Sequence, residues 1–214
     1  MVSDGMRVGL GTGSTVAHLL PALAERGLRR VSCVATSPAT EQAARALGLT
    51  VLEPDEMDEL DLAIDGADQI DPTGWLVKGG GGAHAREKIV AAAARSFVVI
   101  ASAEKAVAQL EPPVPLEVMR FGVHSTLRAL VQARLRLPPS DAESPISRRS
   151  QQSPDGGLLA DYLGSVGDPR ELSARLSATP GVVEHGLFAP EMVSVILIAS
   201  DSGVERRPGA KPAT

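Results

Sequence analysis

Short, fully apolar runs alternate with amphipathic stretches through the first half of the chain. The apolar runs predict strands at residues 7–10, 31–35, 50–52, 60–64, 75–77 and 97–101. Between them the apolar residues recur at helical spacing, as in the stretch that begins at Val16 and ends at Gly27. Further helices are predicted from Ser37, which Pro38 follows, and over residues 83–95. Strands that are apolar on both faces and alternate with helices are typical of a parallel sheet covered on both sides.

The pattern changes at Pro112 and Pro113. From there we predict strands at residues 116–120, 146–152, 158–163 and 182–187, and helices at residues 124–135 and 168–177. The start of the second helix is well marked, because Asp168, Pro169 and Glu171 supply a cap, a first-turn proline and a capping-box acid. The order β-α-β-β-α-β predicts a small ferredoxin-like domain.

A last apolar run, Val193 to Ile198, predicts a strand that returns to the first sheet, and the tail from Pro208 to Thr214 is expected to fray. The fold class is therefore α/β. We predict a parallel-sheet, Rossmann-like domain with a smaller α+β, ferredoxin-like domain, and place them at residues 1–111 with 194–214, and at residues 112–193.

Composition narrows the function. A net charge of -5, a pI near 5.4 and 2% aromatic residues argue against a nucleic-acid partner, and Arg148-Arg149 is too short a basic cluster to change this. No apolar segment approaches the ~20 residues that a membrane span needs. The single cysteine, Cys33, excludes an internal disulfide. We expect a soluble protein of the cytoplasm, with neither nucleic acid nor membrane as a partner.

The four histidines are dispersed, with no carboxylate or cysteine at metal-ligand spacing, and no metal site is predicted: His18, His84, His124 and His185. His84 stands beside a glycine run and could be catalytic. The alternative, which we favour, is a helix residue that faces solvent.

A carboxylate pair follows the predicted strand 60–64. Asp65 comes where the apolar run stops, and Gly66 and Ala67 separate it from Asp68. In open α/β sheets ligands bind just outside the carboxyl ends of strands, and the two small residues leave room for one. The alternative is a polar turn closed by an Asx hydrogen bond.

The run from Gly79 to Gly82 follows Lys78 and stands between a predicted strand and a predicted helix. Each ordered glycine costs about 0.5 to 1 kcal/mol in chain entropy, so this position argues for a backbone held against a ligand rather than for a linker. Bare N–H groups at a helix N-terminus form an anion site, to which Lys78 adds a positive charge.

Glu87 falls in the first turn of the helix that follows. It could act as a general base, or it could simply interact with the helix dipole, which is worth about 0.3 to 1 kcal/mol. The dipole and a nearby lysine would keep it ionised, whereas burial would make it a stronger base. The sequence leaves both readings open.

The turn from Gly11 to Thr15 joins the first strand to the first helix, which is the layout of a phosphate cradle. Neither nucleotide fingerprint is met, since no Gly-Lys-Ser/Thr ending occurs and Ser14 stands where G-x-G-x-x-G needs its third glycine. A sugar phosphate is the better candidate ligand. A tight turn without a ligand is the alternative. The turn and the carboxylate pair are expected at the same edge of the sheet.

Four motifs together resemble ribose-5-phosphate isomerase of the A type: GLGTGST from Gly9, AIDGADQID from Ala63, VKGGGGAHAREKIVAAA from Val77 and PGVVEHGLF from Pro180. The resemblance covers nearly the whole chain. It implies interconversion of ribose 5-phosphate and ribulose 5-phosphate in the pentose phosphate pathway, with no metal or organic cofactor, in a homodimer or homotetramer.

The resemblance also implies roles for individual residues. Glu87 would be the base that moves a proton between C2 and C1 through a cis-enediolate, and Lys78 would stabilise the enediolate oxygen with the N–H groups of Gly79, Gly80 and Gly81. Asp65 and Asp68, with Gly66 and Ala67 between them, would bind sugar hydroxyls and help to open the ring. The remaining substrate-binding residues would be Thr12, Gly13, Ser14, Thr15 and Lys105.

Two alternatives to an active isomerase stay open. Because related α/β folds bind effectors, the chain could be a non-catalytic sugar-phosphate sensor. Family members usually begin with a helix before the first strand, whereas here the first strand starts near Arg7. The chain could therefore be an N-terminally truncated isomerase of impaired activity.

Overall fold

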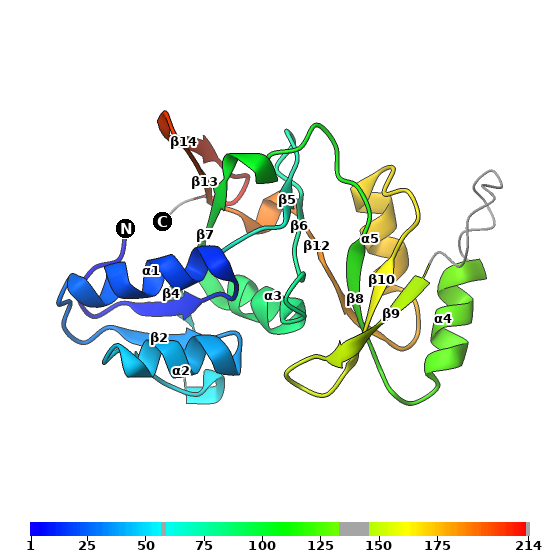
Figure 1. The fold of residues 1–214 in the computed structure, drawn as a ribbon, viewed down its shortest axis with the longest axis horizontal. Helices are drawn as coiled ribbons and strands as arrows, with labels where there is room; N and C mark the ends of the chain where they lie inside the picture. The colour runs from blue at the N-terminus through cyan, green and yellow to red at the C-terminus, as the bar shows by residue number, and fades with distance from the viewer. Residues whose placement is uncertain (57–58, 133–145, 213–214) are drawn as a thin grey trace. The chain divides into compact units, whose positions relative to one another are not determined.

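The structure, a computed structural model, describes residues 1–56, 59–132 and 146–212 (Figure 1). The chain divides into two compact units. Unit 1 comprises Met1–Ala67, Arg86–Ala106 and Ala189–Thr214, and unit 2 comprises Asp68–Ala85 and Val107–Phe188.

Unit 1 is built on a seven-stranded sheet in the order β14-β13-β7-β4-β1-β2-β3. Its pairs are parallel except for β13 with β14, which confirms the predicted α/β fold with a mainly parallel sheet. The strands are β1 (Arg7–Leu10), β2 (Ser32–Ala35), β3 (Thr50–Val51), β4 (Leu60–Asp65), β7 (Ala94–Ser102), β13 (Val195–Ser200) and β14 (Gly203–Pro208).

Three helices accompany this sheet: α1 (Ser14–Glu25), α2 (Pro38–Ala46) and α3 (His84–Ala93). Helix α1 packs against β4, and α2 packs against β2 (Figure 1). The Ser37 side chain accepts a hydrogen bond from the Thr40 N–H at the start of α2, as its capping sequence predicts. Short 3-10 helices lie at η1 (Pro54–Glu56), η2 (Ala103–Lys105) and η3 (Pro190–Met192).

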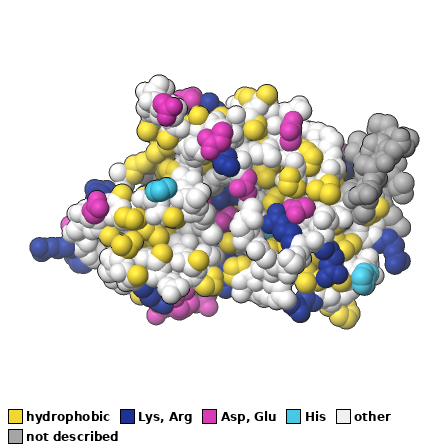
Figure 2. Space-filling model, viewed as in Figure 1, with side chains coloured by type: hydrophobic (Ala, Val, Ile, Leu, Met, Phe, Trp, Pro, Cys, Tyr) yellow, Lys and Arg dark blue, Asp and Glu magenta, His cyan; other side chains and the backbone are white. Residues whose placement is uncertain are grey.

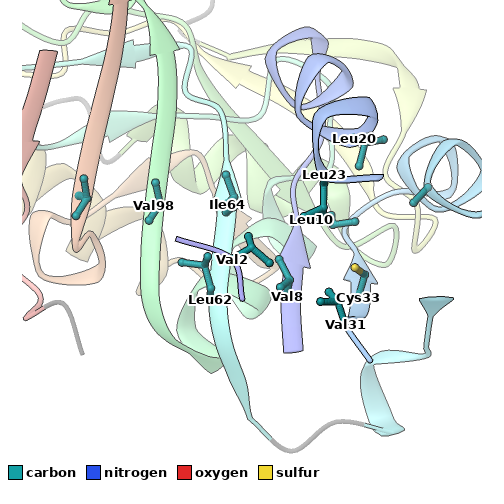
Figure 3. Packing of buried hydrophobic residues seen from close by; sticks show 12 residues of the cluster. Val2, Val8, Leu10, Leu20, Leu23, Val31, Cys33, Leu62, Ile64 and Val98 are labelled. Atoms are coloured by element: carbon teal, nitrogen blue, oxygen red, sulfur yellow. The ribbon is translucent and has the colours of Figure 1, made fainter. Parts of the chain in front are cut away.

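The hydrophobic core of unit 1 consists of aliphatic side chains from neighbouring strands and from α1. Figure 3 shows Val8, Ile64 and Val98 on three adjacent strands, and each is at most 5% exposed. Burying one such side chain stabilises the fold by about 1.5 to 3 kcal/mol. Cys33 belongs to the same cluster, and its burial raises the pKa of the thiol to about 11.

Unit 1 differs from the prediction in three details. The helix predicted to Arg95 ends at Ala93, because Ala94 already pairs with Leu60 as the first residue of β7. Strand β14 was not predicted. The tail was expected to fray from Pro208, but it is held as far as Lys211, since the N–H groups of Gly209 and Lys211 donate to the carbonyls of Ser194 and Val193. Residues 213–214 of that prediction lie outside the described residues.

Unit 2 contains a four-stranded antiparallel sheet in the order β11-β8-β10-β9, with helices α4 (Val123–Gln132) and α5 (Pro169–Ser177). Counted along the chain this is the order 4-1-3-2 of a split β-α-β fold, as the ferredoxin-like prediction requires. The strands are β8 (Val114–Val118), β9 (Ile146–Gln152), β10 (Leu158–Tyr162) and β11 (Val182–His185). Residues 133–135 of the helix predicted over 124–135 lie outside the described residues.

A three-stranded sheet in the order β12-β6-β5 completes unit 2, with strands β5 (Gln69–Ile70), β6 (Leu76–Val77) and β12 (Leu187–Phe188). The single strand predicted over 182–187 is divided at Gly186, where a Cβ would lie 2.1 Å from the Lys78 carbonyl oxygen. Strand β5 pairs with β6, and β6 pairs with β12. Residues 68–85 therefore group with unit 2, whereas the sequence placed them in the first domain.

Among the described residues, no helix is long and apolar enough to cross a membrane.

Candidate active site

Asp65, the last residue of β4, holds the turn that follows β1. The Asp65 Oδ1 atom accepts hydrogen bonds from the Thr12 N–H at 3.1 Å and from the Gly66 N–H at 2.7 Å, and the residue is only 3% exposed. A Cβ on Gly11 would lie 1.9 Å from the Asp65 carboxyl carbon, so only glycine allows this approach. The structure thus brings Thr12, Gly66 and Asp65 together at the carboxyl edge of the sheet.

Hydroxyl groups that follow β2 support the same turn, one directly after the strand and one on α2, and sequence reasoning missed them. The Oγ1 atoms of Thr12 and Thr36 are 2.8 Å apart, and the Thr40 hydroxyl donates to the Gly11 carbonyl at 2.9 Å. Thr36 and Thr40 are both buried. The signal available in the sequence was the position of Thr36 directly after a predicted strand, at the same sheet edge as Thr12.

The rest of the turn opens helix α1. Gly13 is the N-cap residue with φ 115, a left-handed conformation that favours glycine, and no side chain caps the helix. Ser14 is exposed and Thr15 is partly exposed. The first N–H groups of α1 therefore stand beside two hydroxyl side chains, an arrangement that can bind an anion.

Glu87 lies in the first turn of α3 and is 5% exposed. Helix α3 approaches β1 closely, because a Cβ on Gly9 would lie 2.3 Å from the Val90 side chain. Val90 is one turn beyond Glu87 on the same helix, so Gly9 allows α3 to carry the buried carboxylate close against the sheet of unit 1.

Lys105 ends η2, just beyond β7, and is partly exposed. At the start of the same short helix the hydroxyl of the N-cap residue Ser102 donates to the Glu104 carboxylate, and this bond lowers the pKa of Glu104. Unit 1 therefore carries five of the predicted site features: the Thr12 turn, Asp65, Gly66 with Ala67, Glu87 and Lys105.

Asp68, the second carboxylate of the pair, belongs to unit 2 and is exposed. Its backbone N–H donates to the Val77 carbonyl, and its Oδ2 atom accepts a hydrogen bond from the Gly80 N–H at 2.8 Å. The predicted carboxylate and the predicted glycine run are thus in direct contact, and the Gly80 amide holds Asp68 in place.

Lys78 is almost fully buried, with 3% of its surface exposed. Its N–H donates to the Gly186 carbonyl at 2.8 Å, and its Nζ atom lies 5.4 Å from the centre of the Phe188 ring. An ammonium group at this distance over an aromatic face is attracted by the ring quadrupole.

Two glycines of the run need the conformation that only glycine adopts easily. Gly79 has φ 104, and a Cβ there would lie 2.7 Å from the His84 Nδ1 atom; Gly82 has φ 78, and its Cβ would lie 2.4 Å from the Leu159 side chain. The preferred expectation that His84 faces solvent was wrong: His84 is 0% exposed, because its ring packs against the glycine run.

Arg149 contacts the glycine run from the four-stranded sheet of unit 2, and sequence reasoning did not anticipate this. Its Nη1 atom donates to the carbonyls of Gly79 at 2.9 Å and Gly80 at 3.1 Å. Its Nε and Nη2 atoms donate to the two carboxylate oxygens of Asp161, at 2.7 and 2.5 Å. Opposite charges on neighbouring strands were the only signal in the sequence.

Acidic and basic side chains are interspersed on the face of the molecule drawn in Figure 2. Within the described residues, no group of three or more histidine, cysteine, aspartate or glutamate side chains could hold a metal ion.

Residues 32–203 match the family model for ribose 5-phosphate isomerase A, also called phosphoriboisomerase A. The chain is 45% identical to ribose-5-phosphate isomerase A of Dinoroseobacter shibae, over 96% of this chain and 82% of that protein. Ribose 5-phosphate isomerase from Plasmodium falciparum has a similar structure, with a TM-score of 0.86 and 31% identity over 97% of this chain and 92% of that one.

A D-ribose-5-phosphate isomerase in complex with phospho-erythronic acid is also similar in structure. Its TM-score is 0.85 and its identity is 28%, over 97% of this chain and 92% of that chain. The family model thus matches most of this chain, and a relative is 45% identical to it over 96% of its residues. The chain therefore belongs to the ribose 5-phosphate isomerase A family of enzymes.

Proposed function

We propose that this enzyme interconverts D-ribose 5-phosphate and D-ribulose 5-phosphate through a cis-enediolate, with Glu87 as the base. The observation that carries the proposal is the buried carboxylate of Glu87 in the first turn of α3, in a chain of this family. Burial strengthens a carboxylate as a base, and its position on a helix packed against the sheet fixes its direction.

The proposed reaction starts from the open-chain aldose. The Glu87 carboxylate removes the proton from C2, and the electron pair of the broken C–H bond forms the C1–C2 double bond while negative charge develops on O1. The protonated Glu87 then returns the proton to C1. The hydroxyl proton of O2 moves to O1, so that the product is the 2-ketose and the base is regenerated.

Stabilisation of the enediolate falls to Lys78 and the N–H groups of Gly79 and Gly81. These groups are preorganised, since Lys78 is held between Gly186 and Phe188, and the glycine run is held by Arg149. A preorganised donor of this kind is often worth about 3 to 4 kcal/mol in the transition state. Gly80 acts by holding Asp68, to which its N–H donates.

The remaining residues bind the substrate in this proposal. Asp65 and Asp68 accept hydrogen bonds from sugar hydroxyls and assist ring opening, with Gly66 and Ala67 leaving space between them. The phosphate end of the substrate is bound by hydroxyl groups, by the N-terminus of α1 and by a lysine: Thr12, Gly13, Ser14, Thr15 and Lys105.

The ligand of one structural neighbour supports this substrate class. That protein, a D-ribose-5-phosphate isomerase, is in complex with phospho-erythronic acid. A phosphorylated sugar acid carries both a phosphate and a planar carboxylate, and the carboxylate resembles a cis-enediolate in shape and charge. We propose that this chain binds the same class of anion.

The first test is an isomerase assay on the purified chain in the presence of EDTA. We expect conversion of ribose 5-phosphate to ribulose 5-phosphate, because the proposed chemistry uses only side chains and amides. Glu87→Gln should lower kcat by at least about 100-fold, the usual weight of a general base. Glu25→Gln, which changes an exposed carboxylate on α1, is the matched control and should leave kcat unchanged.

Two results would contradict the proposal. Normal turnover by Glu87→Gln would remove Glu87 from the role of base. A wild-type chain that is stabilised by ribose 5-phosphate in a thermal-shift measurement, yet shows no turnover, would instead favour a non-catalytic sugar-phosphate sensor.

A further inference from the structure

Arg149 joins two parts of unit 2 that lie far apart in the sequence. It stands on β9, and the glycine carbonyls that it contacts lie 70 and 69 residues earlier. Its side chain is 19% exposed and that of Asp161 is 15% exposed, so the ion pair is largely removed from water. The sheet meets the run a second time through Leu159, which is two residues before Asp161 on the same face of β10.

The geometry uses the planar fork of the guanidinium group. One edge, formed by Nε and Nη2, binds both oxygens of Asp161, and Nη1 points the other way toward the two glycine carbonyls. An ammonium group could not serve the carboxylate and both carbonyls in this way, because its three donors sit on one flexible atom. Asp161 thus fixes the direction in which Arg149 donates.

The two carbonyls belong to peptide groups whose N–H ends have roles in the proposed function: the Gly81 N–H stabilises the enediolate, and the Gly80 N–H holds Asp68. The Gly79 carbonyl shares a peptide group with the Gly80 N–H, and the Gly80 carbonyl shares one with the Gly81 N–H. Fixing a carbonyl therefore fixes the opposite N–H, and donation from a cation polarises that N–H as well. The Gly80 N–H in turn holds Asp68, which completes a hydrogen-bonded path from Asp161 to Asp68.

We propose that Arg149, oriented by Asp161, is a positioning residue that fixes the peptide groups of the glycine run and, through Gly80, the carboxylate of Asp68. It touches no reacting atom and acts through the N–H groups. This inference rests on the proposed function, because it assigns a role in the same proton-transfer reaction.

The test measures kcat and KM for Arg149→Met and Arg149→Lys in the full chain. Arg149→Met keeps most of the aliphatic stem, and we expect kcat to fall by about 10- to 100-fold, since the Gly81 amide contributes mainly in the transition state. KM should change by less than about 3-fold, because Asp68 keeps the hydrogen bond of its own N–H to the Val77 carbonyl. Arg149→Lys keeps the charge and should remain at least about 5-fold below wild type, because it lacks the fork. Arg148→Met, at the exposed neighbouring position, should match wild type.

A structural role alone would lower the melting temperature and leave kcat of the folded protein unchanged, and that result would overturn the proposal. Full activity of Arg149→Lys would also overturn it, since charge alone would then suffice. If Arg149→Met does not fold, Asp161→Asn tests the proposal instead. This variant keeps the shape of the Asp161 side chain but removes its charge, so it holds the Arg149 guanidinium less firmly. We expect kcat to fall about 3- to 10-fold and KM to stay unchanged. Unchanged kcat in that variant counts against the proposal.

Failure of the proposed function is distinguishable, because it would appear as a wild-type chain without turnover. In that case binding of phospho-erythronic acid, measured by calorimetry, takes the place of kcat. Its carboxylate would contact the same N–H groups, so Arg149→Met should bind about 10-fold more weakly than Arg148→Met. Equal binding by the two variants would refute the positioning role even then.

Discussion

Two glycine-containing loops carry the candidate chemistry, and their charged anchors are of opposite sign. In the first loop, Gly11–Thr15 of unit 1, the Thr12 amide donates to the Asp65 carboxylate. In the second loop, Gly79–Gly82 of unit 2, the carbonyls of Gly79 and Gly80 accept from the Arg149 guanidinium. A carboxylate anchors one loop and a guanidinium anchors the other.

The difference shows how much of each loop local sequence can determine. The anchor of the first loop is the last residue of the strand next to it, so the strand-turn-helix layout nearly determines the contact. The second loop depends on a pair of charged residues on β9 and β10, which its own sequence does not indicate. Anchoring by a neighbouring strand can be predicted from the sequence, whereas anchoring across the fold requires the structure.

The largest effect is expected at the first loop. In Gly11→Ala the new Cβ would lie 1.9 Å from the Asp65 carboxyl carbon, so Asp65 must leave the Thr12 N–H. Overpacking of this kind should lower the free energy of unfolding by about 1 to 3 kcal/mol, and the misplaced carboxylate should lower kcat/KM by about 100-fold. Chemical denaturation and the isomerase assay measure the two effects.

Gly66→Ala is the stability control for this variant, because a Cβ there would meet only the Ile100 carbonyl, at 3.8 Å. Its free energy of unfolding should stay within about 1 kcal/mol of wild type. A Gly11→Ala variant that is as stable and active as wild type would mean that Asp65 does not anchor the loop.

A smaller effect is expected at the second loop. Gly79→Ala introduces a Cβ 2.7 Å from the His84 ring and requires φ 104, so we expect kcat to fall about 10-fold. The added variant His84→Ala removes the two closest ring atoms, leaves the residue-84 Cβ at 3.0 Å, and leaves the strained φ. In a double-mutant cycle the pair should therefore be less impaired than the sum of the single variants, by about 1 kcal/mol in activation free energy. Strict additivity would show that His84 does not confine the loop.

The smallest effect concerns the core beneath the first loop and should leave activity at neutral pH unchanged. Burial raises the pKa of Cys33 from 9.0 to about 11, so the folded protein keeps the thiol proton to higher pH than the unfolded chain. The resulting stability is complete below pH 9 and is lost as the pH rises to about 11, by about 3 kcal/mol in all.

Urea denaturation of wild type and Cys33→Ala across this pH range measures the loss. Only the difference between the two chains reports the thiol, because lysine and tyrosine titrate in the same range. If the free energies of unfolding of the two chains change in parallel with pH, the raised pKa of the Cys33 thiol would be contradicted.

The sequence was most informative where one element determines the next. The position of Asp65 at the end of a strand, the capped starts of α2 and α5, and the β-α-β-β-α-β order of unit 2 all follow from short-range patterns. These patterns are local, so hydrophobic spacing and capping residues are sufficient to predict them.

Features that depend on long-range packing could not be predicted in the same way. Strands β5 and β12 have two residues each, which is too short for a periodicity to appear, whereas β6 lies within the strand predicted at residues 75–77. His84 has an ordinary helical position in the sequence, and its burial against the left-handed Gly79 depends on residues packed in the fold. Arg148 and Arg149 are neighbouring arginines that the sequence does not distinguish. In the structure Arg148 is exposed, whereas Arg149 joins Asp161 to the glycine run.

The close contact between Gly186 and Lys78 has a consequence for the proposed role of Lys78 in substrate binding. The Gly186 carbonyl accepts from the Lys78 N–H, and the absence of a side chain at Gly186 lets the Lys78 carbonyl approach as well. With Phe188 beside its ammonium group, the lysine is 3% exposed. A free lysine side chain has up to about 2 kcal/mol of rotamer entropy to lose when it is ordered. Here that loss occurs when the protein folds, so a sugar phosphate that binds Lys78 meets a cation that is already ordered.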